Sequence, residues 1–519
     1  MKTLRSYVAG RWHEARNRFV PLVNPSTEEE VARASSDGVD FDAVLVHARE
    51  RGGPALRELG FTARGQLLKD ASRALREHRA ELLELSRLNS GTTESDGSFD
   101  IDGASGALAW YAALARTLGD QPFLTDGDVV QIGRSDAFCV QHALVPRTGA
   151  AVLVNAFNFP AWGFGEKAAC ALLAGMPVIV KPATATALLT ERCIGILVGA
   201  AILPEGSLQL ICGGTGDLLD RLGPQDVLAF TGSAQTARTL RAKANLLAAN
   251  TRFNIEADSL NAAVLAPGVD DGPTFELFVR DVVREITQKA GQKCTAVRRI
   301  LAPAAALTHV RDALAERLRV VRTGDPRDPS VTMGPLATAD QLRDALDGVR
   351  TLARDTRVIA GSDRRIDGIA APPGRGYFLA PTLLAADDAD HARAVHEREV
   401  FAPVATLLPY DGSPADAARI VELGGGMLVT SLYADDEDWL RAFLRHGGSL
   451  AGRVYIGSAA SAGEAPGSGV AFPHALHGGP GRAGGGEELG GLAGIRLYTQ
   501  RVALQGARSM LAALTPRPS

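Results

Sequence analysis

The stretch GAAVLVNAFNFP, residues 149–160, joins a short apolar run to a turn that carries an amide and two aromatic rings. The run at 150–154 has the length and side chains of a fully buried strand. It is the first of five such runs before Pro267, and helical patterns alternate with them. The predicted strands span residues 150–154, 178–181, 208–212, 227–230 and 253–256, with helices at 186–199 and 234–244 between them. This alternation is typical of parallel strands joined by crossover helices and predicts a doubly wound, dinucleotide-binding sheet.

A second alternating unit follows and predicts a separate α/β domain. It begins with the amphipathic stretch 275–290. The later segments of this unit are 299–302, 306–319, 341–354, 428–433 and 454–456. Between the first helices and the first sheet, the extended runs 129–133 and 138–144 flank a polar turn and predict a protruding hairpin. Such an arm, with a strand-like segment at 495–499, is suited to pairing with another subunit.

Composition limits the classes of protein. The chain has 519 residues, of which 46% are hydrophobic and 22% charged, with a net charge of -4. These values are typical of a soluble protein of two or three domains. No block of like charge indicates a nucleic-acid partner, and no run reaches the ~18 apolar residues of a membrane span. The first residues also lack the apolar stretch of a secretory signal, so we expect a cytoplasmic protein.

The five cysteines are odd in number and widely spaced, which argues against both a disulfide framework and a zinc cluster. We expect reduced thiols and no bound metal. Four of them, Cys139, Cys170, Cys193 and Cys212, are interpreted as small buried apolar side chains.

The fifth cysteine, Cys294, lies in the segment GQKCT, residues 291–295. A thiolate at this position could attack an aldehyde carbonyl and give a hemithioacetal, whose carbon can lose a hydride. Asn158 follows the first predicted strand and offers an N–H to the oxyanion, together with the backbone N–H of Cys294. Glu256 ends another predicted strand and could take the thiol proton or activate a water molecule. We therefore predict acyl chemistry on an aldehyde, with these three residues at one site.

Short segments along nearly the whole chain resemble the aldehyde dehydrogenase superfamily. They are YVAGRW (7–12), VNPST (23–27), FNFP (157–160), KPA (181–183), FTGS (230–233), GQKC (291–294), GDP (324–326), MGPL (333–336), GYFLAPT (376–382) and EVFAPV (399–404). The resemblance implies a Rossmann-type cofactor domain, a second α/β catalytic domain and a small β oligomerisation arm. It places the cofactor domain at 1–125 and 147–257 and the catalytic domain at 258–458. It places the oligomerisation arm and its strand at 126–146 and 492–510, and a glycine-rich active-site loop at 459–491.

The resemblance also implies a nicotinamide cofactor. Lys181 matches the position that contacts the adenosine ribose, and Thr184 stands where NAD-using members commonly carry a glutamate. Loss of that negative charge favours NADP, with NAD as the alternative. Gly232 and Ser233 open a helix whose N-terminus suits the pyrophosphate. The other positions that the resemblance places at the cofactor are Phe157, Ala183, Glu399 and Phe401.

Two segments depart from the common family pattern. Glu256 is followed by Ala257-Asp258-Ser259, where Leu-Gly-Gly is usual, so the backbone behind the base differs. The run 477–491 is rich in glycine and includes Glu488, which matches a second family carboxylate and is the alternative base. A disordered linker is the other interpretation of this run. 

These segments are similar to a branch of the family that oxidises CoA-linked semialdehydes formed by aromatic ring cleavage, as in benzoate oxidation. Because the sequence stops at Ser519, we expect no fused hydratase domain of the kind that some members of the branch carry. We expect NADP-dependent oxidation of a small-molecule substrate, a CoA-linked semialdehyde such as 3,4-dehydroadipyl-CoA semialdehyde, to its acid, in a homodimer or dimer of dimers. The alternatives are a CoA-acylating enzyme, a general dehydrogenase of free aldehydes, a thiol esterase, and a binding protein without catalysis.

Overall fold

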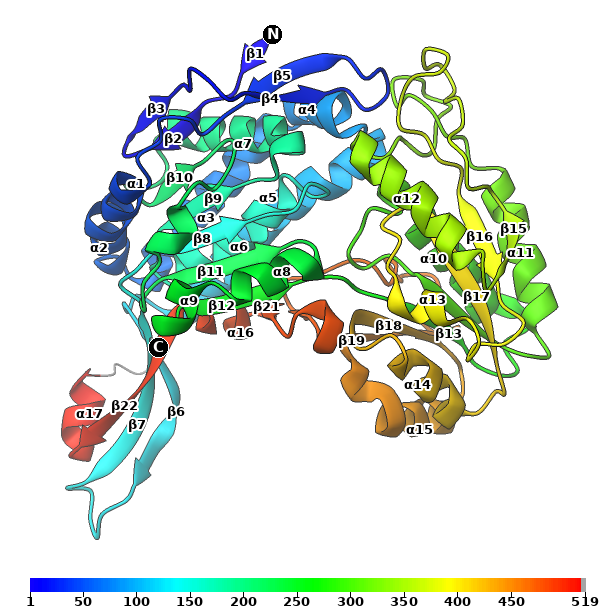
Figure 1. Ribbon diagram of the computed structural model, residues 1–519. Helices are drawn as coiled ribbons and strands as arrows, with labels where there is room; N and C mark the ends of the chain where they lie inside the picture. The colour runs from blue at the N-terminus through cyan, green and yellow to red at the C-terminus, as the bar shows by residue number, and fades with distance from the viewer. Residues whose placement is uncertain (515–519) are drawn as a thin grey trace.

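The computed structural model describes residues 1–514 and contains two seven-stranded sheets, each flanked by helices (Figure 1). The first sheet has the order β12-β11-β8-β9-β10-β2-β3. Its strands are β2 (Ser6–Val8), β3 (Arg11–His13), β8 (Ala151–Val154), β9 (Val178–Lys181), β10 (Leu208–Leu210), β11 (Val227–Thr231) and β12 (Arg252–Glu256). Strands β8 to β12 pair in parallel, so the predicted doubly wound sheet is confirmed.

Helices pack on both faces of this sheet, as crossover connections require. They include α6 (Trp162–Leu173), α7 (Ala187–Gly199), α8 (Ala234–Arg241) and α9 (Ala244–Ala248). The single helix predicted at 234–244 is wrong in one respect, because the backbone of Lys243 is extended and separates α8 from α9. The amino-terminal third adds β1 (Lys2–Thr3), β4 (Val20–Val23), β5 (Glu30–Ala34), α1 (Phe41–His47), α2 (Gly53–Arg57), α3 (Phe61–Glu77), α4 (Arg79–Ser90) and α5 (Glu94–Leu118).

The second sheet has the order β15-β16-β17-β14-β13-β18-β19 and is parallel except for β15 at its edge. Its strands are β13 (Ala262–Leu265), β14 (Arg299–Pro303), β15 (Arg357–Ala360), β16 (Thr382–Ala385), β17 (Val404–Tyr410), β18 (Met427–Tyr433) and β19 (Ala451–Gly457). Its helices are α10 (Gly272–Thr287), α11 (Leu307–Arg319), α12 (Ala339–Leu352), α13 (Arg393–Glu397), α14 (Pro414–Glu422) and α15 (Glu437–Gly447). The helix predicted at 275–290 ends earlier, because Lys289 and Ala290 adopt left-handed φ of 54° and 52°.

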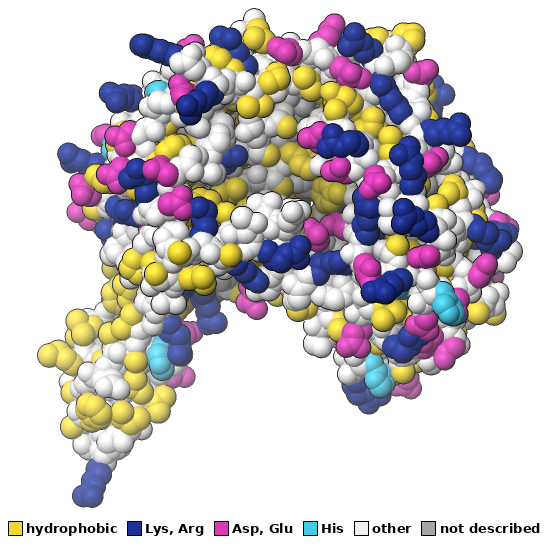
Figure 2. Space-filling view, in the orientation of Figure 1, with side chains coloured by type: hydrophobic (Ala, Val, Ile, Leu, Met, Phe, Trp, Pro, Cys, Tyr) yellow, Lys and Arg dark blue, Asp and Glu magenta, His cyan; other side chains and the backbone are white. Residues whose placement is uncertain are grey.

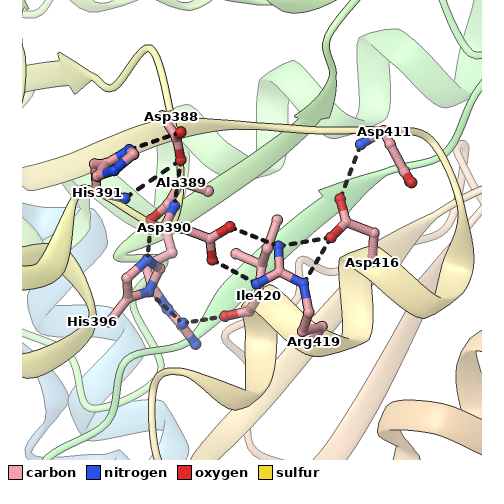
Figure 3. A network of polar contacts seen from close by, with 10 residues as sticks. Asp388, Ala389, Asp390, His391, His396, Asp411, Asp416, Arg419 and Ile420 are labelled. Atoms are coloured by element: carbon pink, nitrogen blue, oxygen red, sulfur yellow. Dashed lines mark hydrogen bonds and ion pairs between the residues drawn. The ribbon is translucent and has the colours of Figure 1, made fainter.

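Buried Arg299 ties β14 to the helices behind it. Its guanidinium donates to the carbonyls of Leu260, Ile420 and Val421, and the side chain is fully buried. Figure 3 shows the neighbouring network, in which Arg419 of α14 forms ion pairs with Asp390 at 2.5 Å and Asp416 at 2.8 Å. These contacts join the loop before α13 to α14 and fix the back of the second sheet.

The arm is a three-stranded sheet of order β22-β7-β6 that projects from the body (Figure 1). It consists of β6 (Leu124–Gln131), β7 (Cys139–Pro146) and β22 (Thr499–Gly506), followed by α17 (Arg508–Leu514). The strand predicted at 495–499 is wrong. A short helix, α16 (Leu492–Arg496), covers its first two residues, because Ile495 is fully buried beside α6, and the strand begins only at Thr499. Among residues 1–514 no helix is long and apolar enough to cross a membrane.

The glycine-rich segment packs closely against the ends of both sheets and is not a linker. It forms the hairpin β20 (Leu476–Gly478) and β21 (Glu487–Leu489). The amide of Gly486 donates to the carbonyl of Ile255 in β12, and that of Ala257 donates to Ala483. A Cβ at Gly478 would lie 2.0 Å from the Gly486 carbonyl oxygen, and a Cβ at Gly486 would lie 2.3 Å from that of Ile255. Glycine is required there because backbone approaches backbone.

We predict that Gly486→Ala lowers the free energy of unfolding by about 1–3 kcal/mol and reduces turnover, because the added methyl pushes the hairpin away from β12. Denaturant unfolding and initial rates measure both effects. Gly463→Ala is the matched control, since a Cβ there meets no atom within 4 Å. Equal stability of the two variants would contradict this account of the packing.

Candidate active site

Cys294 lies at the junction of the two sheets, on a rigid turn after α10. The carbonyl of Cys294 accepts a hydrogen bond from Asn261 Nδ2 at 2.8 Å. Gly291, just before it, has a φ of +68°, and a Cβ there would lie 2.2 Å from the Ala402 carbonyl oxygen. The Cys294 side chain is partly exposed, whereas the other four cysteines are buried, as predicted for them. Cys294 is therefore the accessible thiol among the five.

Asn158 follows β8 and lies against the same segment. Its Nδ2 donates to the carbonyl of Gln292 at 3.0 Å, and its side chain lines the same cavities as Cys294. A carboxamide has two N–H donors, so one remains available to an oxygen in the cavity. The turn 155–160 thus directs an amide toward the thiol, as expected for an oxyanion site.

Glu256 ends β12 and is 3% exposed, so it is not the exposed strand-end carboxylate that an isolated glutamate would suggest. Thr231 donates to its Oε2 at 3.4 Å, and His477 Nε2 lies 3.3 Å from its Oε1. Burial opposes ionisation, but the charge of the His477 ring and its hydrogen bond lower the pKa of Glu256 below its ordinary value. The carboxylate is therefore ionised at neutral pH.

His477 is the contact that sequence reasoning missed. It lies in β20 and is 5% exposed, and its Nε2 is 3.9 Å from Cys294 Sγ. The only signal in the sequence was its place at the head of the glycine-rich run. Burial acts to lower the pKa of His477, but the nearby Glu256 carboxylate outweighs it and raises the pKa. Burial and the Glu256 charge raise the pKa of the Cys294 thiol, so the thiol is protonated at rest.

Glu488, the other candidate base, is held in a buried ion pair beside Glu256. Lys167 Nζ in α6 lies 3.0 Å from Glu488 Oε2 and 3.1 Å from Glu166 Oε1, and Asn254 donates to Glu488 Oε1. Oxygens of Glu166, Glu256 and Glu488 lie within 4.8 Å of one another. Burial raises the pKa of Glu166 to about 7.

A second cavity, of about 490 Å³, leads from Cys294 and Glu256 along the first sheet. Its walls include six of the residues expected at the cofactor, namely Phe157, Ala183, Gly232, Ser233, Glu399 and Phe401. The Oε1 atom of Glu399 is buried without a hydrogen bond, although Arg298 Nε lies 3.5 Å away. This unpaired oxygen of Glu399 lies at the same cavity as the Phe401 ring and could accept a hydrogen bond from a ribose hydroxyl. Burial raises the pKa of Glu399 to about 7. These residues fit a nicotinamide dinucleotide.

Lys181 and Thr184 lie close to this cavity in sequence but do not line it. Lys181 ends β9, and no ion pair of its ammonium with a described residue is seen. Burial lowers its pKa. Thr184 donates to the carbonyl of Gly213 at 3.3 Å. The end of β9 therefore presents a cation next to a neutral side chain.

Asp258 belongs to the segment after Glu256 that differs from the common family pattern. Its Oδ1 accepts from the amide of Ala234 at 2.8 Å, in the first turn of α8, whose N-cap is Ser233. It also lines the 490 Å³ cavity and contributes to the raised pKa of Glu399. A pyrophosphate at this helix end would compete with the Asp258 carboxylate for the same N–H groups.

The model of the aldehyde dehydrogenase family matches residues 12–503. The chain belongs to this family. It is also 44% identical over 478 residues to 3,4-dehydroadipyl-CoA semialdehyde dehydrogenase of Aromatoleum evansii, covering 92% of this chain and 93% of that protein. The protein is accordingly an NAD(P)-dependent aldehyde dehydrogenase.

Solved structures show the same fold. A complex of 3,6-anhydro-L-galactose dehydrogenase with NAP superposes with a TM-score of 0.84 at 22% identity, over 97% of this chain and 100% of that one. Betaine aldehyde dehydrogenase from Staphylococcus aureus in complex with NAD+ gives a TM-score of 0.82 at 22% identity, over 97% and 96%. The predicted aldehyde dehydrogenase-like architecture is confirmed.

Proposed function

We propose that this aldehyde dehydrogenase oxidises a CoA-linked semialdehyde from aromatic ring cleavage, such as 3,4-dehydroadipyl-CoA semialdehyde, to the carboxylic acid. The observation that carries the chemistry is the meeting of Cys294, Asn158 and Glu256 at one cavity. The substrate class is supported by the 44% identity to the Aromatoleum enzyme over almost the full length of both chains. The unpaired cysteines support a reducing, cytoplasmic setting.

In this proposal Glu256 takes the proton of Cys294, and the thiolate forms a bond to the aldehyde carbon. The electron pair of the carbonyl double bond moves to oxygen, which accepts a hydrogen bond from the free N–H of the Asn158 side chain. A nicotinamide bound in the 490 Å³ cavity supplies the two-electron oxidant, as hydride acceptor. Glu256 then releases that proton to solvent and takes a proton from water as the water oxygen attacks the carbonyl carbon of the Cys294 thioester; the carbon–sulfur bond breaks and the sulfur leaves as a thiolate.

Two alternatives differ in the last step or in the substrate. A CoA-acylating enzyme would pass the acyl group to free CoA and has no need of a buried, ionised Glu256 beside the thiol. A general dehydrogenase would prefer free aldehydes. Glu488 is disfavoured as the principal base, because Lys167 and Asn254 already bind both of its oxygens. Its proposed role is to set the charge around Lys167.

We predict that Cys294→Ala binds NADP but oxidises no aldehyde, since no other thiol reaches the cavity. Fluorescence titration with NADPH and absorbance at 340 nm measure the two properties. In the unaltered enzyme, initial rates should favour CoA-linked semialdehydes over free aldehydes, and the product should be the acid. Turnover by the variant would end the assignment of the nucleophile, and a new thioester made from free CoA would favour the acylating alternative.

We further propose NADP as the preferred cofactor, because Lys181 stands without a carboxylate at the end of β9. We predict that Thr184→Glu lowers the ratio of kcat/KM for NADP over NAD by about tenfold or more, as the new charge repels a 2′-phosphate. Thr184→Gln, of similar size but neutral, is the control. An unchanged ratio in the glutamate variant would place the selectivity elsewhere.

The arm is proposed to join subunits into a homodimer or a dimer of dimers. Figure 2 shows hydrophobic side chains over much of its visible face. Val130 is 56% exposed, Ile132 52% and Phe138 47%, and both β6 and β22 are edge strands. An exposed apolar sheet of this kind is stabilised by pairing with another copy.

We predict that Val130→Asp lowers the molar mass measured by light scattering, because a charge on this face costs desolvation in the interface. Val320→Asp replaces an equally apolar side chain that is 72% exposed after α11 and should leave the mass unchanged. Loss of association in both variants, or in neither, would count against the arm as the contact.

A further inference from the structure

His477 Nε2 is in contact with both the sulfur and the carboxylate of the proposed reaction. It lies 3.9 Å from Cys294 Sγ and 3.3 Å from Glu256 Oε1, in a site where the imidazole and the carboxylate are buried and the sulfur is partly exposed. We propose that His477 is a further catalytic residue, whose protonated ring pairs with the Cys294 thiolate when the thiol proton moves to Glu256. The inference rests on the proposed roles of Cys294 and Glu256.

The position of the ring is set by the hairpin and not by chance packing. His477 pairs with Glu488 across β20 and β21, and the close approach of Gly478 to Gly486 fixes that pairing. The Nδ1 atom of His477 is buried without a partner. Because the ring receives no support from Nδ1, its contacts through Nε2 decide its charge, and Nε2 faces the two reacting groups.

The charge balance of the step explains why a cation is needed. The directions of the three pKa shifts favour a neutral thiol, a protonated ring and a carboxylate at rest. When the S–H bond breaks and an O–H bond forms on Glu256, the negative charge moves from oxygen to sulfur. The protonated ring, which lies 3.3 Å from Oε1 and 3.9 Å from Sγ, then pairs with Sγ in place of Oε1, so the new anion keeps a cation beside it.

The surroundings act on the charge of the ring in opposite directions. Other charged groups lie on the elements packed around β20, namely Glu166 and Lys167 of α6, Glu488 of β21 and Arg453 of β19. Arg453 opposes the protonated ring, whereas the Glu166 carboxylate favours it. A histidine with only a structural role would pair with the charge of Glu256, and its removal would leave the ionisation of the Cys294 thiol unchanged. The ionisation of the thiol therefore distinguishes a structural from a catalytic role.

The test is the rate of iodoacetamide alkylation of Cys294 against pH, without cofactor or aldehyde. In the unaltered enzyme we expect a rate that is nearly constant across neutral pH, because proton transfer within the site needs no proton from solvent. In His477→Gln, which keeps an N–H but no charge, we expect a rate at pH 7 lower by about tenfold or more. His474→Gln, an exposed neighbour that accepts from Trp110, is the control and should match the unaltered enzyme.

Mass spectrometry identifies the alkylated cysteine, and thermal melting with NADPH binding checks that each variant is folded. If His477→Gln does not fold, the pH dependence of alkylation in the unaltered enzyme still tests the proposal. An alkylation rate that rises about tenfold per pH unit through neutrality is that of a simple thiol and would overturn it. Equal alkylation in folded His477→Gln and unaltered enzyme would also overturn it, even if turnover fell. Failure of Cys294 as nucleophile would show separately, as turnover by Cys294→Ala.

Discussion

Backbone packed directly on backbone across the end of β12 is the constraint on which the site depends. The carbonyl of Ile255 and the amide of Ala257, on either side of Glu256, are bound by Gly486 and Ala483. Side chains in that segment would hold the two chains apart, as the contacts of Gly478 and Gly486 indicate. The glycines give up conformational entropy on folding, and in return Glu256 meets groups from a remote part of the chain.

The same packing encloses an unusual number of buried charges. Three glutamates, one lysine and one histidine lie within a few contacts of the thiol, and each is less than a tenth exposed. Burying a charge costs several kcal/mol unless it is paired. Lys167 between two carboxylates and His477 beside a third meet that requirement. Stability and reactivity are thus linked, because each pairing that offsets desolvation also sets a proton affinity.

Much of this arrangement could be predicted from the sequence. The five parallel strands were found because strands buried on both faces are continuous apolar runs, as at 151–154. Cys294, Asn158 and Glu256 were predicted from short segments that resemble one family and from their places after predicted strands, and all three line one cavity.

Other features depend on contacts that no local pattern encodes. His477 carries no motif, and its place beside Cys294 arises only once the hairpin packs on β12. Asp258 was recognised as a departure, but its bond to the first turn of α8 requires two separate elements to meet. The segment 495–499 has β-branched and aromatic residues typical of a strand, yet burial of Ile495 against α6 favours a helix. Tertiary packing overrides local propensity in each case.

The order of the groups along the chain has a consequence for biosynthesis. The sulfur and the carboxylate are made well before the imidazole and the hairpin that carries it. A nascent polypeptide that has emerged as far as β19 already contains the nucleophile but lacks the cation beside it. The hairpin that encloses the nucleophile is therefore the last part of the site to be made, and the site is completed only when that segment docks.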